Sequence, residues 1–244
     1  MNNLEGVIQV LAIGLIVASF LLNTSRFLKT IELCKECLLI LKERFCIKDE
    51  KLTKSFYGRI YFIMWKAYSR INDDENSVKC AEKLLQIYHE SGDRLMECNL
   101  SIKLGRMYFR QSKYSQAVQV YERALVISKE IGGIKKEQSC YGSLGALYTS
   151  VGEYEKARQN LEKSIVFCKK IGNRNGEAAS YANLGTVYRS LGEYEKAREH
   201  LEKSLVIQKE IGDRHGKAAS YGILGIVYKS LGEYKKEIGP FSLS

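Results

Sequence analysis

Apolar residues along most of this chain recur at steps of three and four, which is the spacing of one face of an α-helix. Within residues 171–210, Tyr181, Leu184 and Tyr188 belong to one such face, and a second face follows Gly192. Glycine adopts positive φ easily, so Gly192 is expected to end the first helix. The pattern therefore predicts two helices joined by a tight turn.

The same pair of faces returns every forty residues along the chain. Residues 171–194 and 211–234 are identical at 17 of 24 positions. Self-similarity at a period of about 20 to 50 residues is typical of stacked repeats, in which each unit has an apolar flank that only its neighbour can cover. We therefore predict an all-α fold, a right-handed superhelical solenoid of antiparallel helix pairs.

The repeat is regular in one part of the chain and degenerate in the other. We expect degenerate helix pairs over residues 1–91 and a regular array over residues 92–244. The array divides into 92–131, 132–171, 172–211 and a truncated 212–244. In the last repeat the second helix should stop near Ile238, because Pro240 follows and proline costs about 3 kcal/mol in a helix interior.

Glycine also returns in the middle of the first helix of each regular repeat. There it costs about 1 kcal/mol relative to alanine, so its recurrence predicts that the partner helix approaches closely. The column contains Gly105, Gly145, Gly185 and Gly225. Residues 51–90 fit the same register but have Trp65 in this column, so the packing of that pair must differ.

The motif Leu-Gly-x-x-Tyr, followed by Gly-x-Tyr-x-x-Ala and then Ala/Ser-Leu, resembles the tetratricopeptide repeat. One copy contains Leu104-Gly105, Tyr108, Tyr114 and Ala117. The forty-residue period is similar to the Leu-Gly-Asn or Pins-like proteins and to the long arrays of invertebrates. The resemblance implies a non-enzymatic scaffold or adaptor that binds a partner's peptide or helix in a concave groove lined by the first helices.

The resemblance also assigns lining positions by column. They are Arg106, Arg110, Ser143, Asn183, Thr186, Arg189 and Lys229. Arginine can form bidentate hydrogen bonds with a carboxylate, and an asparagine amide can both donate a hydrogen bond to a peptide group and accept one from it. The alternative, that these residues only keep a solvated face soluble, stays open. The asparagine that follows the glycine in Leu-Gly-Asn proteins is replaced here by Arg106, Ala146, Thr186 and Ile226, so a Pins-type ligand is not expected.

Residues 6–22 are apolar and contain no charge, and two structural interpretations fit them. They fit as the first helix of the pair whose second helix covers residues 27–41, with Ala18 in the glycine column. They could instead form a signal anchor, although about 17 residues is the lower limit of a membrane span and no positive charge precedes them. We favour the packed helix and a cytoplasmic protein, with a membrane-anchored adaptor as the alternative.

Charge and cysteine content change this picture little. The net charge is +10, but repeat 171–210 has six basic and six acidic residues, so an RNA-binding solenoid is disfavoured. Seven cysteines at irregular spacing indicate reduced thiols, and Cys34-x-x-Cys37 is only half of a zinc site. We expect no metal and no cofactor.

The chain also lacks the short motifs that carry chemistry. It has no glycine-rich phosphate loop and no Gly-x-Ser-x-Gly elbow, and its histidines stand in columns where sister repeats have unrelated residues. We therefore expect neither catalysis nor a small-molecule substrate. The sequence predicts a protein–protein interaction adaptor.

Overall fold

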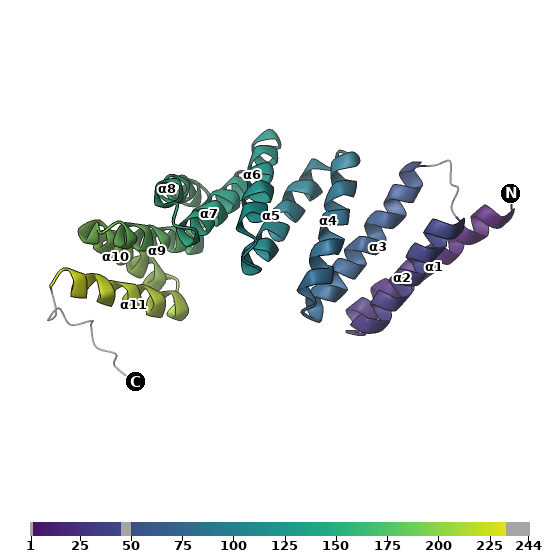
Figure 1. Ribbon diagram of the computed structural model, residues 1–244, viewed down its shortest axis with the longest axis horizontal. Coiled ribbons are helices and arrows are strands. Elements are labelled where there is room, and N and C mark those ends of the chain that lie inside the picture. Colours follow the sequence, from purple (N-terminus) through teal and green to yellow (C-terminus); the bar gives the residue numbers. More distant parts are fainter. Residues whose placement is uncertain (1, 45–49, 233–244) are drawn as a thin grey trace. The chain divides into compact units, whose positions relative to one another are not determined.

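The computed structural model describes residues 2–44 and 50–232, and the regular secondary structure of these residues is entirely α-helical (Figure 1). The chain forms two compact units, Met1–Gln111 and Ser112–Ser244. The first unit contains α1 (Asn2–Asn23), α2 (Phe27–Arg44), α3 (Glu50–Arg70), α4 (Asp74–Glu90) and α5 (Arg94–Arg110). The second contains α6 (Tyr114–Glu130), α7 (Ile134–Ser150), α8 (Tyr154–Ile171), α9 (Arg174–Ser190), α10 (Tyr194–Glu210) and α11 (Arg214–Ser230).

Within each unit the helices pack as successive antiparallel pairs. In the second unit α7 packs on α8 and α9 on α10, and in the first unit α1 packs on α2 and α3 on α4. Each second helix also contacts the first helix of the next pair, as α8 contacts α9. First helices contact one another directly as well, α7 with α9 and α9 with α11. The predicted class, an all-α solenoid of antiparallel helix pairs, is confirmed.

The joints between repeats show why helices begin and end where they do. Gly172 closes α8 with φ of 68°, in the left-handed region that favours glycine. The next residue, Asn173, accepts a hydrogen bond from the backbone N–H of Gly176 at 3.0 Å and so caps α9. Asp73, Asp93 and Asp213 cap α4, α5 and α11 in the same way. One short motif thus ends one helix and starts the next.

The mid-helix glycines allow close approach, as the sequence predicts. A Cβ atom added at Gly185 would lie 2.5 Å from Cγ of Leu201, and one added at Gly145 would lie 2.6 Å from Cγ of Leu161. Real Cβ atoms do not approach carbon atoms so closely. The glycine column therefore brings α7 against α8 and α9 against α10.

The pair α3–α4 solves the same packing problem with different side chains. Trp65 stands in the glycine column and is 9% exposed. Ala81, fully buried, stands in the column that contains Leu161 and Leu201 in later pairs. The large and small residues have thus changed places between two columns that face each other elsewhere in the chain.

The N-terminal apolar segment forms α1, the first helix of a pair with α2. Its inner side buries Leu11, Leu15 and Ala18, and α1 contacts both α2 and α3. The predicted stop of the last repeat, near Ile238 and Pro240, lies outside the described residues.

Candidate partner-binding site

Five of the predicted lining residues lie on adjacent first helices of the second unit. Ser143 is on α7, Asn183, Thr186 and Arg189 are on α9, and Lys229 is on α11. Because α9 contacts both α7 and α11, these helices form one continuous layer. We refer to the surface carrying these five residues as the α7–α9–α11 face.

Arg189 has an unusual environment on this face. Its side chain is only partly exposed, and its Nε atom is buried without a hydrogen-bond partner among the described residues. A guanidinium group always carries its charge, and a buried donor left unpaired costs about 1–3 kcal/mol. The Nε atom of Arg189 is thus closed off by the protein, and only the outer nitrogens of the guanidinium group remain open to solvent.

The neighbouring polar groups offer both acceptors and donors. Thr186 donates its hydroxyl hydrogen to the carbonyl oxygen of Ala182 at 3.2 Å, which leaves the hydroxyl oxygen free to accept. Asn183, half-buried one turn away, has no hydrogen-bond partner among the described residues. A half-buried amide without a partner can pair with the N–H and C=O of an extended peptide.

The two remaining predicted residues belong to the first unit. Arg106 and Arg110 are exposed on α5. The Nη2 atom of Arg110 lies 3.3 Å from Oδ1 of Asp74 on α4. Both side chains of this ion pair are solvated, so it contributes little to stability, but it already supplies Arg110 with a carboxylate. Arg110 is thus a weaker candidate for ligand binding than Arg189.

The structure also contains two hollows beside α3 that sequence reasoning missed. The larger, of about 780 Å³, is lined by α3, by the end of α4 and by the start of α5, with Gly58, Phe62, Ile87 and Met96 as its apolar part. Here the backbones of α3 and α5 lie further apart than those of α7 and α9, although Nζ of Lys103 on α5 lies 5.0 Å from the centre of the Trp65 ring on α3. No local sequence signal reports how closely the backbones of two successive first helices approach.

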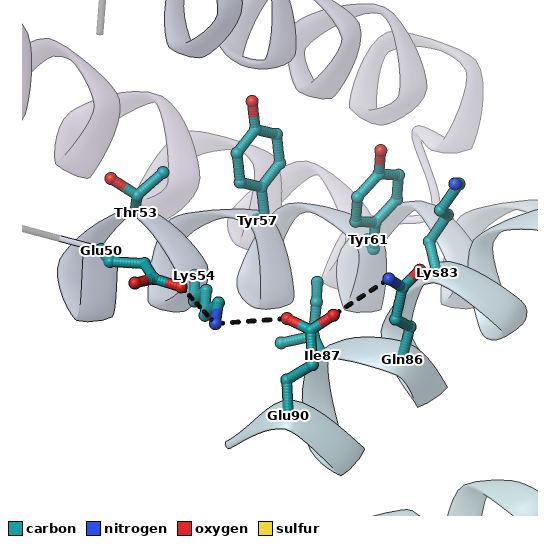
Figure 2. Close-up of a pocket in the computed structure, with 9 residues that line it drawn as sticks. All are labelled: Glu50, Thr53, Lys54, Tyr57, Tyr61, Lys83, Gln86, Ile87 and Glu90. Carbon is teal, nitrogen blue, oxygen red and sulfur yellow. Dashed lines mark hydrogen bonds and ion pairs between the residues drawn. The ribbon is translucent and has the colours of Figure 1, made fainter. Parts of the chain in front are cut away.

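The smaller hollow, of about 390 Å³, lies between α3 and α4 (Figure 2). Tyr57 and Tyr61 stand side by side on α3 with ring centroids 6.2 Å apart, and their hydroxyl groups point away from α4. At its end, Nζ of Lys54 lies 2.6 Å from Glu50 and 3.2 Å from Glu90. These hydrogen bonds raise the pKa of Lys54. Glu50, Lys54 and Glu90 therefore satisfy one another and hold the start of α3 to the end of α4.

The buried thiols of the first unit are poorly suited to metal binding. Burial raises the pKa of Cys34 to about 12 and also raises that of Cys37. Metals bind the thiolate, which these conditions disfavour. Across residues 2–44 and 50–232, no group of three or more His, Cys, Asp or Glu side chains is placed to hold a metal ion.

The fold defines a helical-repeat protein of the interaction class. The tetratricopeptide-repeat family model matches residues 137–210 and again 176–241. The model of the soluble NSF attachment protein, SNAP, matches residues 52–173, which is half of the chain. The chain belongs to the tetratricopeptide-repeat family, and over residues 52–173 it is similar to SNAP.

Three solved structures show the same fold at low sequence identity. The tetratricopeptide-repeat sensor protein PH0952 of Pyrococcus horikoshii has a TM-score of 0.73 at 22% identity, over 91% of this chain and 34% of that one. The apo form of RapI has a TM-score of 0.71 at 16% identity, and the match covers 92% of this chain and 81% of that one. YrrB, described as a TPR protein with an unusual peptide-binding site, has a TM-score of 0.61 at 16% identity, and the match covers 86% of this chain and 90% of that one.

One curated protein is also similar. The chain is 26% identical over 91 residues to the 43 kDa receptor-associated protein of the synapse from Gallus gallus. The match covers 37% of this chain and 20% of that protein. The chain therefore spans about a fifth of the length of this relative.

Proposed function

We propose that this protein is a cytoplasmic, non-enzymatic adaptor that binds an extended peptide or helical segment of a partner protein on the α7–α9–α11 face. The observation that carries the proposal is Arg189, a half-buried arginine whose Nε atom has no partner among the described residues. The Nε atom is itself covered by the protein, so an acidic or C-terminal carboxylate of the partner would pair with the outer nitrogens of the guanidinium group.

The surrounding residues support a peptide as the ligand. Asn183 can pair with the backbone of an extended segment, and Lys229, exposed on the next first helix, adds a second cation. The five residues that define this face are either positively charged or neutral and polar. We therefore expect the ligand to contain at least one acidic residue, and the binding to weaken as salt screens the exposed charges.

A selection from a displayed random-peptide library on the full chain, followed by fluorescence anisotropy with the enriched peptides, tests this proposal. Arg189→Glu should weaken binding by about tenfold or more, because it removes a charge-assisted hydrogen bond worth about 1.5–3 kcal/mol. Arg198→Glu is the matched control: Arg198 lies on α10 and is paired with Glu195 at 2.5 Å, so its loss should leave affinity unchanged. Equal affinity for wild type and Arg189→Glu would reject this face.

A second candidate is an adaptor attached to a membrane through residues 6–22. The segment Glu5–Asn23 of α1 has a mean hydropathy of 2.2 and the length to cross a bilayer, and 22% of it is buried in the structure. A segment this apolar and this little covered favours contact with lipid. Retention of the tagged chain in membranes after a carbonate wash or after a salt wash measures the strength and mode of such attachment.

A further inference from the structure

The outer side of α1 is a stripe of large apolar side chains exposed to solvent. Val10 is 54% exposed, Ile13 61%, Ile16 69% and Phe20 63%. They recur at three- and four-residue steps and therefore share one side of the helix. We call these four residues the outer stripe. An exposed apolar patch of this kind marks a surface that meets a partner or a membrane.

The positions of α9 that are equivalent to the outer stripe pack against α8, the helix that precedes α9. With Ala18 aligned to Gly185, Val10 corresponds to Glu177 and Ile13 to Ser180. Both of these α9 residues are buried. Nζ of Lys169 on α8 lies 4.0 Å from Glu177, and the hydroxyl groups of Ser164 on α8 and Ser180 lie 2.9 Å apart. In α9 these columns thus form a polar interface with α8.

The outer stripe has no such polar groups. Where α9 has a carboxylate and a hydroxyl that bond to α8, α1 has only Val10 and Ile13. A preceding helix pair of this family would bring hydrogen-bonding groups that α1 could not satisfy, and buried polar groups without partners cost about 1–3 kcal/mol each. The stripe is therefore better suited to a hydrocarbon medium than to another repeat.

The opposite side of α1 limits how the helix can meet lipid. Leu11, Leu15 and Ala18 are buried against the helices that α1 contacts, α2 and α3. A helix that crossed the bilayer would have to leave these contacts. A helix lying in the plane of the surface keeps them and places only its outer side at the acyl boundary.

The residues that follow α1 add the appropriate charge. Arg26 and Lys29 are exposed, and no ion pair or hydrogen bond engages either side chain within residues 2–44 and 50–232. From Asn23 to Ile31 the sequence contains these two cations and no acidic residue, and the exposed Glu32, Lys35 and Glu36 follow on α2, so cations outnumber acidic residues by three to two from Asn23 to Glu36. Cations beside an apolar surface stripe favour anionic lipid headgroups.

From these observations we propose that α1 lies in the plane of an anionic lipid surface, with the outer stripe at the acyl boundary and Arg26 and Lys29 among the headgroups. The proposal rests on the second candidate function, membrane attachment, and specifies its geometry and its lipid. It is independent of peptide binding on the α7–α9–α11 face.

Flotation of the full chain with two kinds of vesicle tests the proposal: phosphatidylcholine alone, and phosphatidylcholine mixed with phosphatidylserine. The wild-type chain should float with the mixed vesicles. Ile13→Glu with Ile16→Glu should lower binding by about tenfold or more, because charges on the outer stripe oppose its insertion at the acyl boundary. Arg26→Ala with Lys29→Ala should lower it by about tenfold on mixed vesicles and much less on phosphatidylcholine alone.

The matched control is Val166→Glu with Val206→Glu. These valines are 65% and 57% exposed on α8 and α10, so the change has the same chemistry and similar exposure at another place. This control should float like wild type, and circular dichroism should show unchanged helicity for all variants. Arg189→Glu should also float like wild type, which separates this test from the peptide-binding test.

Three results would overturn the proposal. Equal flotation of wild type and the Ile13→Glu, Ile16→Glu variant would show that the stripe does not insert. Resistance to a carbonate wash would indicate a spanning helix, which preserves membrane attachment but contradicts the in-plane geometry. Absence of flotation, together with a dimer that the same variant dissociates in light scattering, would assign the stripe to a second copy of the chain.

Discussion

The hydroxyl group of Tyr148 lies 3.3 Å from Oε1 of Glu122, and the same contact at the same distance joins Tyr228 to Glu202. In each case the tyrosine is on the first helix of one pair and the glutamate is on the second helix of the preceding pair. Burial and the nearby carboxylate raise the pKa of Tyr148, so its hydroxyl remains a donor at neutral pH. Tyrosines in this column thus form hydrogen bonds between consecutive repeats in addition to packing in the core.

Tyr148→Phe tests this fastening. Loss of the hydroxyl removes one hydrogen bond and leaves the ring in place, so the free energy of unfolding should fall by about 1 kcal/mol. Tyr154→Phe is the control, because the Tyr154 hydroxyl has no partner among the described residues. Urea denaturation of the two variants should separate them, and equal stabilities would show that the contact contributes nothing.

Two glycine-to-alanine changes should have opposite signs. Alanine normally stabilises a helix interior by about 1 kcal/mol relative to glycine. Gly185→Ala should instead destabilise by about 1–3 kcal/mol, because its Cβ would meet Leu201 at 2.5 Å. Gly222→Ala should stabilise α11, because no side chain and no other helix among the described residues lies within 4 Å of the added carbon. Thermal melting of both variants gives the signs directly, and two shifts of the same sign would contradict the assigned contact.

The exchange of large and small residues between Trp65 and Ala81 predicts coupling. Trp65→Gly alone should cost about 3–5 kcal/mol by leaving a cavity, and Ala81→Leu alone should cost about 1–3 kcal/mol by overfilling the interface. The double variant restores the glycine and leucine of the later pairs and should be more stable than the sum of the single effects predicts. A double-mutant cycle measured by denaturation checks this. Strict additivity would show that the two columns do not face each other in α3–α4.

His200 predicts a pH dependence of stability. Its ring stacks on Tyr181 and Tyr188, with centroids 5.8 and 5.1 Å away. Burial, helped by Lys203, lowers its pKa in the folded state. The unfolded chain therefore binds the proton more tightly, and stability should fall as the pH drops below about 6.5, the ordinary value for histidine.

His200→Asn should reduce this loss, because asparagine does not titrate and already occupies the same column as Asn160. Melting temperatures at pH 7.5 and at pH 5 for both proteins provide the comparison. An identical acid-induced decrease in the two proteins would mean that other groups cause it.

Much of this architecture follows from the sequence because its causes are local. The apolar spacing sets the helices, a glycine able to adopt positive φ ends one of them, and the Asp or Asn that follows caps the next. Gly185 predicts a close contact between helices from the sequence alone, because glycine in a helix interior is otherwise unfavourable. Because equivalent positions of successive repeats are forty residues apart, the same prediction applies to each repeat in turn.

The binding face was only partly predictable. The columns placed Asn183, Thr186 and Arg189 on one first helix, but only the structure showed that the Nε atom of Arg189 is buried without a partner among the described residues. It also showed Asp74 beside Arg110 at 3.3 Å, a contact between two residues 36 positions apart in the sequence. Such pairings depend on how neighbouring helices are placed, which no single column encodes.

The sequence by itself therefore determined the helices, their joints and the face that each repeat turns toward its neighbours. Only the tertiary structure decided which of those faces are covered. Ile13 on α1 is 61% exposed, while Ser180 in the equivalent column of α9 is buried against a preceding helix. The physical reason is that a helix's sequence sets the direction of its side chains, whereas burial is set by whatever packs against them.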